Sequence, residues 1–336
     1  MTPPENSETL IYGQFGSFGC SPLKSSQRRE SDNYLSSSLF AKLLEEVSQM
    51  RSNIYLWGSE PLSHPYIASV LETIGERKIY CVLATRGHNL ENLAPSLVEN
   101  QIAELVISLD GTQQVYKNLN PRSNAYEEME SGMRALLRVR KEKKSRNPLI
   151  TGTLMITKEN YHFLSDILDL AEDLGIERFI FCHPFTVDEQ KGHGYNNFLM
   201  DTFNSPSLSW ERYLLDREGL EPSALLRDIM RIRKKPHRIP YSFFPALKPW
   251  QISDYYKDYD YTSGIERCHI PWYAANVLEN GEIVTCNDYP DIIIGHINED
   301  TIASVWNNES MRHFRTELIR QGRLPICSRC SGLYAV

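Results

Sequence analysis

The sequence predicts an α/β protein, in which a partial (β/α)6 barrel precedes a small α+β module with four cysteines. Short apolar, β-rich runs alternate with amphipathic helical stretches from residue 8 to about residue 185, a pattern typical of parallel strands joined by helices. Four of the seven cysteines then fall within about the last 70 residues. A doubly wound sheet is also compatible with the first pattern, because six repeats are too few for a closed eight-stranded barrel.

The 336 residues are enough for one large domain and a small one. We expect three parts along the chain: the barrel over residues 8–235, a bridge over residues 236–267, and the cysteine module over residues 268–336. The bridge is rich in Tyr, Pro and Asp, which separates it in composition from the parts on either side.

Composition excludes several classes of partner. The net charge of −7 argues against a broad basic surface for nucleic acid. No run of 18 apolar residues is present, which argues against a membrane span. The first ten residues lack the basic start and apolar stretch of a secretory signal, so we expect a cytoplasmic protein. An odd number of cysteines does not suggest a disulfide framework in a chain of this length, and clustered cysteines in such a chain indicate metal ligands.

Six runs in the barrel have the near-continuous apolar character of strands buried on both faces. They cover residues 9–13, 53–58, 79–85, 104–111, 149–157 and 178–185. Apolar residues at three- and four-residue spacing predict helices over 37–50 and 160–174. Because ligands of α/β folds collect where parallel strands end, the residues that follow these strands are the candidate site.

The rest of the chain has fewer regular patterns. One helix is predicted over 223–234, within the last part of the barrel. In the cysteine module a hairpin is predicted over 274–286, with Asn280 and Gly281 as its tight turn. A single amphipathic helix is predicted over 302–320. Cys81 and Cys182 lie in apolar strand patterns and are expected in the core, and His183 is expected to be structural.

The four clustered cysteines have the spacing of a metal site. Cys268 and Cys286 flank the hairpin, and Cys327 and Cys330 form a C-x2-C pair that places two sulfurs on one centre. Four thiolates are the ligand set of a tetrahedral zinc ion and also of a cubane iron–sulfur cluster. Ligand type alone leaves both metals open.

The stretch CHIPWYAANVLENGEIVTCNDYPDIIIGHINEDTIASVWNNESMRHFRTELIRQGRLPICSRC resembles a SPASM or twitch domain. It has the first Cys, the hairpin with Gly before the second Cys, a Gly-His-Ile step, a Val-Trp-Asn helix and the closing Cys pair. The resemblance implies an auxiliary [4Fe–4S] cluster on Cys268, Cys286, Cys327 and Cys330. Zinc is the alternative metal. Six residues follow Cys330, which matches the shorter, single-cluster version of the domain.

The preceding part resembles the radical SAM partial barrel over about 170 residues. The segment LWGSEPLSHP is similar to the Gly-Gly-Glu-Pro motif of that family, with Ser59 in place of the second Gly. The resemblance implies that Gly58, Ser59 and Glu60 hold the amino group of S-adenosylmethionine (SAM). LATRG resembles the next strand end, and SLDGTQQVYKNLNPR resembles a segment in which Ser108 and Arg122 reach the SAM carboxylate.

The loop after the first strand departs from the family. Radical SAM enzymes have C-x3-C-x2-C there, three thiolates that leave one iron open for SAM, whereas this chain has Gly13, Ser17 and Cys20 at the matching positions. Only Cys20 is a thiolate donor, and it is also compatible with an incidental cysteine. One thiolate is not expected to hold the cluster, so SAM binding is doubtful. The two changes are compatible with either an engineered or a natural origin.

Three functions therefore stay open. The first is a radical SAM/SPASM protein that binds its auxiliary cluster but has lost SAM-radical chemistry, a pseudoenzyme. The second is an active radical SAM oxidoreductase or a peptide- or sugar-modifying enzyme, in which the cofactor supplies the difficult chemistry and the protein orients it. The third is a zinc-binding adaptor, which requires only the C-terminal module. The substrate is a small molecule or a peptide in the first two cases.

Overall fold

The computed structural model describes residues 10–15, 35–58, 60–119, 124–207, 209–214, 219–262 and 264–334. They form two compact units, the first from residues 1–55, 185–216 and 254–336, and the second from residues 56–184 and 217–253. Residues 185–216 thus group with the C-terminal part of the chain. The predicted domain bounds, which divide the chain by composition and motif, stay a prediction.

The second unit is built on parallel strands. They are hydrogen-bonded in the order β3 (Cys81–Thr85), β4 (Glu104–Ser108), β5 (Leu149–Met155), β6 (Arg178–Cys182), β7 (Tyr241–Phe244). The end of β2 (Asn53–Gly58) lies beside β3. Five of the predicted strands are found here, each within a few residues of its predicted bounds. With the small antiparallel sheet of the first unit, this confirms the predicted α/β class with its partial barrel.

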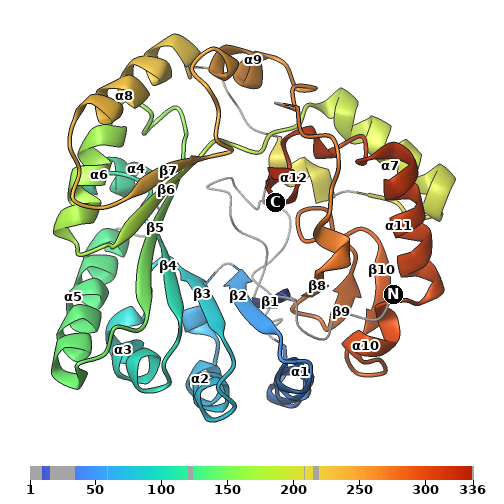
Figure 1. Cartoon of the computed structure of the whole chain (residues 1–336), viewed down its shortest axis with the longest axis horizontal. Helices are drawn as coiled ribbons and strands as arrows, with labels where there is room; N and C mark the ends of the chain where they lie inside the picture. The colour runs from blue at the N-terminus through green and yellow to red at the C-terminus, as the bar shows by residue number, and fades with distance from the viewer. Residues whose placement is uncertain are drawn as a thin grey trace. The chain divides into compact units, whose positions relative to one another are not determined.

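Helices flank the outer side of these strands (Figure 1). They are α2 (Ile67–Glu76), α3 (Leu90–Glu99), α5 (Ala125–Lys143), α6 (Leu164–Asp173) and α8 (Pro222–Lys234). A short 3₁₀ turn, η1 (Pro61–Ser63), follows β2, and a short helix, α4 (Gln113–Leu119), follows β4. The core between helices and strands is apolar, with Leu83, Leu105, Ile107 and Phe181 fully buried. The alternation of apolar runs seen in the sequence is therefore the alternation of strands and covering helices.

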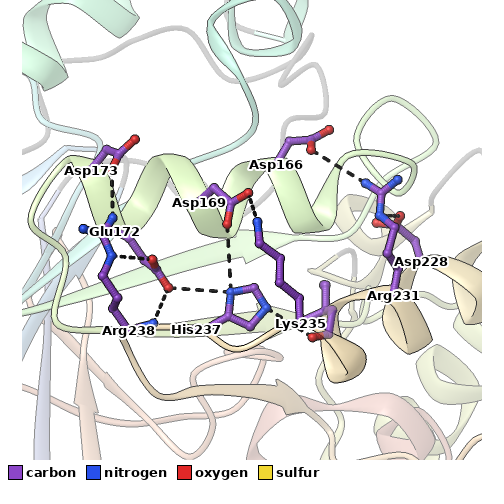
Figure 2. A network of polar contacts seen from close by, with 10 residues as sticks. Asp166, Asp169, Glu172, Asp173, Asp228, Arg231, Lys235, His237 and Arg238 are labelled. Atoms are coloured by element: carbon purple, nitrogen blue, oxygen red, sulfur yellow. Dashed lines mark hydrogen bonds and ion pairs between the residues drawn. The ribbon is translucent and has the colours of Figure 1, made fainter.

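Charged side chains join α6 to the chain that leaves α8 (Figure 2). Asp169 is paired with Lys235, and His237 Nδ1 lies 3.6 Å from Glu172 Oε1. Arg238 donates through Nε to Glu172 Oε2 at 2.8 Å. The acidic face of α6 is thus neutralised by the residues that lead from α8 into β7.

The first unit contains a small sheet. Strand β1 (Leu10–Phe15) runs parallel to β8 (Ala274–Val277), which pairs antiparallel with β9 (Glu282–Val284), and β9 pairs antiparallel with β10 (Ile293–His296). The predicted hairpin is confirmed as β8 and β9, with Gly281 at φ 89° in the turn. A positive φ at this position explains the glycine.

The helical elements of this unit are mostly C-terminal. They are α1 (Ser37–Gln49), α7 (Glu189–Phe203), η2 (Ser209–Tyr213), η3 (Ile270–Trp272), α10 (Ile302–Val305), α11 (Glu309–Gln321), η4 (Cys327–Arg329) and α12 (Ser331–Tyr334), and α9 (Gln251–Lys257) crosses the boundary between the units. None of the helices within the described ranges is long and apolar enough to cross a membrane.

Three helices differ from the prediction. The helix predicted over 302–320 is two helices, because the side chain of Asn308 accepts from Met311 N and starts α11 anew. The helix predicted over 160–174 begins only at Leu164. Helix α7 was not predicted at all, since its sequence EQKGHGYNNFLMDTF contains two glycines and little apolar periodicity.

Candidate functional site

The four C-terminal cysteines all belong to the first unit, on loops beside its small sheet. Cys268 precedes η3, and its N–H donates to the carbonyl of Gly322 at 3.1 Å, directly after α11. Cys286 follows β9, while Cys327 and Cys330 lie at the start and just past the end of η4. The hairpin and the end of α11 therefore present the four thiols from segments that are far apart in the chain.

The thiols lie close enough to influence one another's protonation. Burial raises the pKa of Cys327 to about 12, and the neighbouring Cys268 contributes to this rise. The pKa of Cys286 is well above its ordinary value because of burial, then Asp288, then Cys327. Thiolates so buried and so close repel each other unless a cationic centre compensates their charge. Four thiols are the donor type that binds a zinc ion or an iron–sulfur cluster.

A carboxylate lies at the same place. The thiol of Cys330 donates to Asp288 Oδ2 at 3.0 Å, and Tyr289 N donates to Cys286 Sγ at 3.4 Å. No group of three or more His, Cys, Asp or Glu side chains in the described part of the chain has the geometry of a single-ion site. The convergence of all four sulfurs on one centre stays a prediction. The sequence analysis did not single out Asp288, although its place two residues after Cys286 was a usable signal.

Three tyrosines lie near these thiols, with Tyr195 and Tyr289 buried and Tyr213 half-buried. The ring of Tyr289 lies 5.6 Å from that of Tyr195 in α7 and 5.2 Å from that of Tyr213 in η2. Burial raises the pKa of each phenol well above its ordinary value, and the charges of the cysteines add to the rise. The three rings therefore form part of the surroundings of the cysteine side chains. Tyr195 and Tyr213 carry no local signal for this role in the sequence.

The predicted SAM-site residues occupy the ends of neighbouring strands in the second unit. Gly58 ends β2 with φ 149°, and Ser59 lies outside the described residues. The carboxylate of Glu60 accepts three hydrogen bonds, from Thr85 Oγ1 at 2.6 Å and Leu62 N at 3.1 Å on Oε1, and from Arg86 N at 2.9 Å on Oε2. Burial raises its pKa, against the opposing effect of these donors.

Ser108 ends β4, the strand next to β3, and pairs in register with Thr153 of β5. Gly58 and Glu60 thus lie at and just after the carboxyl end of β2, and Ser108 lies at the carboxyl end of β4, with β3 between these strands. Arg122 lies outside the described residues. Whether these residues contact SAM stays a prediction.

The loop expected to hold the SAM cluster is described only at its start. Gly13 lies in β1, opposite Val277 of β8, while Ser17 and Cys20 lie outside the described residues. At the end of β6, His183 is 1% exposed, and burial lowers its pKa to about 3, so it stays neutral near pH 7. This is the structural role expected for it.

Comparison with known families finds a match in the C-terminal part of the chain. Residues 268–331 match the SPASM family, described as an iron–sulfur cluster-binding domain. Among curated proteins, none matches the chain by sequence. The SPASM match begins at Cys268 and includes Cys286, Cys327 and Cys330, so it covers all four cysteines described above.

Solved structures resemble the chain over nearly its whole length. Streptococcus suis SuiB bound to S-adenosylmethionine aligns with a TM-score of 0.60 at 12% identity, over 96% of this chain and 72% of SuiB. SuiB bound to the precursor peptide SuiA aligns with a TM-score of 0.59 at 12% identity, over 96% and 71%. The protein anSMEcpe with bound AdoMet and Cp18Cys peptide aligns with a TM-score of 0.59 at 14% identity, over 91% and 81%.

These structures have the radical SAM fold, and at such identities the likeness concerns the fold alone. It agrees with the parallel strands of the second unit and with the motifs at their ends. The family match concerns the four-cysteine segment, in which Cys327 and Cys330 are buried and Cys268 and Cys286 half-buried. The chain therefore has the fold of these solved structures, and its residues 268–331 match the SPASM iron–sulfur cluster-binding domain.

Proposed function

We propose that the chain binds one auxiliary [4Fe–4S] cluster through Cys268, Cys286, Cys327 and Cys330. The observation that carries the proposal is the presence of four cysteines within a segment that matches the SPASM family, with Cys327 and Cys330 buried and the Cys330 thiol 3.0 Å from Asp288, two residues after Cys286. A cluster bound there supplies a site for one-electron transfer. The protein's part is to hold the sulfurs and, through Tyr195, Tyr213 and Tyr289, to keep water away from them.

Anaerobic reconstitution with iron and sulfide tests this assignment. We expect about four irons and four sulfides per chain in the unaltered protein and loss of both in Cys286→Ala. Cys81→Ala is the matched control, because Cys81 is buried in β3 of the other unit and should leave the iron content unchanged. Binding of about one zinc and no iron would instead support the zinc-binding adaptor.

We propose further that SAM-radical chemistry is disabled in this chain. Gly13 offers no side-chain ligand and the hydroxyl of Ser17 is a poor substitute for a thiolate, which leaves Cys20 alone to hold a second cluster. A three-thiolate site is the minimum that leaves one iron open for SAM. SAM contacts would then rest on Gly58, Ser59, Glu60, Ser108 and Arg122, without chelation by iron, and we expect weak affinity.

The restored variant Gly13→Cys/Ser17→Cys tests this second assignment. After reconstitution we expect about eight irons per chain in the variant and about four in the unaltered protein. Formation of 5′-deoxyadenosine with a strong reductant is expected only from the variant. Product from the unaltered chain would contradict the loss of activity, whatever its iron content.

A peptide is the ligand class that the solved structures favour. SuiB is seen with the precursor peptide SuiA and anSMEcpe with the Cp18Cys peptide. The residues that follow the parallel strands are the place where we expect such a ligand to bind. Binding of a panel of fluorescent peptides to the reconstituted protein, compared with small alcohols and sugars, distinguishes the two substrate classes.

A further inference from the structure

The two residues between Cys327 and Cys330 are polar but almost fully buried. Ser328 is 1% exposed and Arg329 is 2% exposed, and Arg329 is among the largest fully buried side chains in the described residues. Burying a guanidinium costs several kcal/mol unless other groups replace its water. The groups that take the place of this water around Arg329 therefore show which parts of the protein contact the C-x2-C turn.

Arg329 is held by two segments of the first unit. Its guanidinium lies 4.9 Å from the ring centre of Tyr255 and 4.8 Å from that of Tyr259, so two aromatic faces accept the charge. Nη1 donates to Thr186 Oγ1 at 2.9 Å, and Nη2 donates to the carbonyl of Asp258. These contacts tie the turn to residue 186 on one side and to residues 255–259 on the other.

Ser328 repeats this connection. Its hydroxyl donates to the carbonyl of Tyr259 at 2.6 Å and accepts from Lys191 Nζ at 3.2 Å. Lys191 is also paired with Asp260. Both residues of the turn thus contact residues 186–191 and 255–260 and contribute to holding the two segments together.

The two segments lie at or beside helix ends. Residues 186–191 come after β6, which ends at Cys182, and enter α7 at Glu189. Residues 255–260 begin in the last turn of α9, which ends at Lys257, and continue beyond it. Residues 258–262 form turns and irregular structure rather than a helix or strand. A segment of this kind depends on side-chain contacts for its order.

We propose that Arg329 is a positioning residue through which binding of the iron–sulfur cluster and ordering of residues 186–191 and 255–260 form one coupled equilibrium. A cluster on Cys327 and Cys330 fixes the backbone of the turn, and the turn then fixes the guanidinium between Tyr255 and Tyr259. The inference rests on the proposed auxiliary cluster. It adds that cluster binding orders two segments that lie far from the cysteines in the chain.

Hydrogen exchange by mass spectrometry on the full chain tests the coupling. In the reconstituted protein, residues 255–260 should exchange slowly, and removal of iron by a chelator should accelerate exchange there and in residues 186–191. In Arg329→Met with its iron retained, exchange at 255–260 should match the iron-free protein. Arg329→Lys, which keeps the charge but not the planar fork, should be intermediate. Arg320→Met, at an exposed arginine of α11, is the control and should exchange like the unaltered protein.

A second variant keeps the test decisive if Arg329→Met does not retain iron. Tyr259→Leu removes one aromatic face without altering the turn, and coupling is reciprocal. We expect the chelator to remove iron at least about fivefold faster from Tyr259→Leu than from the unaltered protein. Unchanged iron loss in Tyr259→Leu together with slow exchange at 255–260 in the iron-free protein would overturn the inference. The iron content of the reconstituted protein tests whether the proposed cluster binds, whereas hydrogen exchange tests the coupling through Arg329. The two proposals can therefore fail separately.

Discussion

Thr85 Oγ1 donates a hydrogen bond of 2.6 Å to Glu60 Oε1, which ties the end of β3 to the turn that follows β2. The same hydroxyl accepts from Gly87 N at 2.9 Å. The Thr85 hydroxyl therefore hydrogen-bonds to both strand-end segments of the candidate SAM site and holds them in place relative to each other. This arrangement orients the carboxylate before any ligand binds.

Thr85→Val should lower the free energy of unfolding by about 1–3 kcal/mol, because a buried carboxylate and a buried amide each lose a partner. Urea unfolding followed by circular dichroism measures the change. Thr73→Val is the control, since the Thr73 hydroxyl donates to Ser69 O on the exposed side of α2, and should change stability by less than about 0.5 kcal/mol. Equal losses in the two variants would contradict the role given to Thr85.

His183 should make stability depend on pH below neutrality. Its pKa of about 3 in the folded protein lies below the ordinary value of 6.5, so the unfolded chain binds more protons. Stability should therefore fall as pH decreases from about 6.5 toward 3, by up to about 1.4 kcal/mol per pH unit from this residue. In His183→Gln this contribution should be absent.

Urea unfolding at pH 5, 6 and 7 measures the slope for the unaltered protein and for His183→Gln. The exposed His162, replaced in His162→Gln, is the control and should leave the slope unchanged. A slope in His183→Gln equal to that of the unaltered protein would exclude His183 as its source.

Two glycines of α7 should respond in opposite directions to the same substitution. A Cβ at position 192 would lie 2.1 Å from Trp210 Cε3, whereas at position 194 it meets no atom within 4 Å. Gly192→Ala should cost about 1–3 kcal/mol because the indole must move. Gly194→Ala should stabilise by about 0.5–1 kcal/mol, since alanine favours the helix. Thermal unfolding of both variants checks the packing of α7, and losses of equal size would refute it.

Iron removal should loosen the C-terminal module before the parallel sheet. The hairpin and α11 bury little surface by themselves, so metal binding supplies much of the stability of residues 268–334. Limited proteolysis after chelation should first cut within that range, while residues 81–182 stay protected. Simultaneous cleavage of both regions would show that the metal does not stabilise the module selectively.

The ion pairs between α6 and the residues that follow α8 should make a modest, pH-dependent contribution to the free energy of unfolding. Burial acts to raise the pKa of Glu172, but hydrogen bonds from Arg238 outweigh it and hold the pKa below its ordinary value. This stabilisation is present above the unfolded pKa of about 4.5 and is lost as pH falls below it. Because the Arg238 side chain is 71% exposed, water screens this ion pair, and we expect Arg238→Met to cause only a small loss of stability at pH 7.

The loss in Arg238→Met should shrink at pH 3, where Glu172 is protonated. Arg233→Met, at an exposed arginine at the end of α8, is the control and should be neutral at both pH values. Urea midpoints at pH 3 and 7 supply the comparison. If Arg238→Met lost the same stability at pH 3 and pH 7, the loss would come from packing of the Arg238 side chain rather than from its charge.

Local patterns determined the regular elements of this protein. Strand β2 has the predicted bounds of 53–58, and the turn at Asn280 and Gly281 lies where the dipeptide placed it. Continuous apolar runs and an Asn-Gly turn specify structure within a few residues, since burial on both faces and a positive φ are local demands. The four C-terminal cysteines were also found from the sequence, because thiolate ligands and C-x2-C spacing are rare in other contexts.

Only the tertiary structure decided what surrounds those cysteines. Tyr195, Tyr213 and Arg329 reach their partners across some 70 to 140 residues, as the contacts of Tyr195 with Tyr289 and of Arg329 with Thr186 show. No periodicity or spacing encodes such contacts. Helix α7 could not be predicted for the same reason. Its Gly192 lowers the helix propensity of the segment, and a glycine is present there because a Cβ would collide with Trp210. The sequence by itself determined the four candidate cysteine ligands and the strands. Packing between distant segments decided which tyrosines lie near the cysteines and which residues Arg329 contacts.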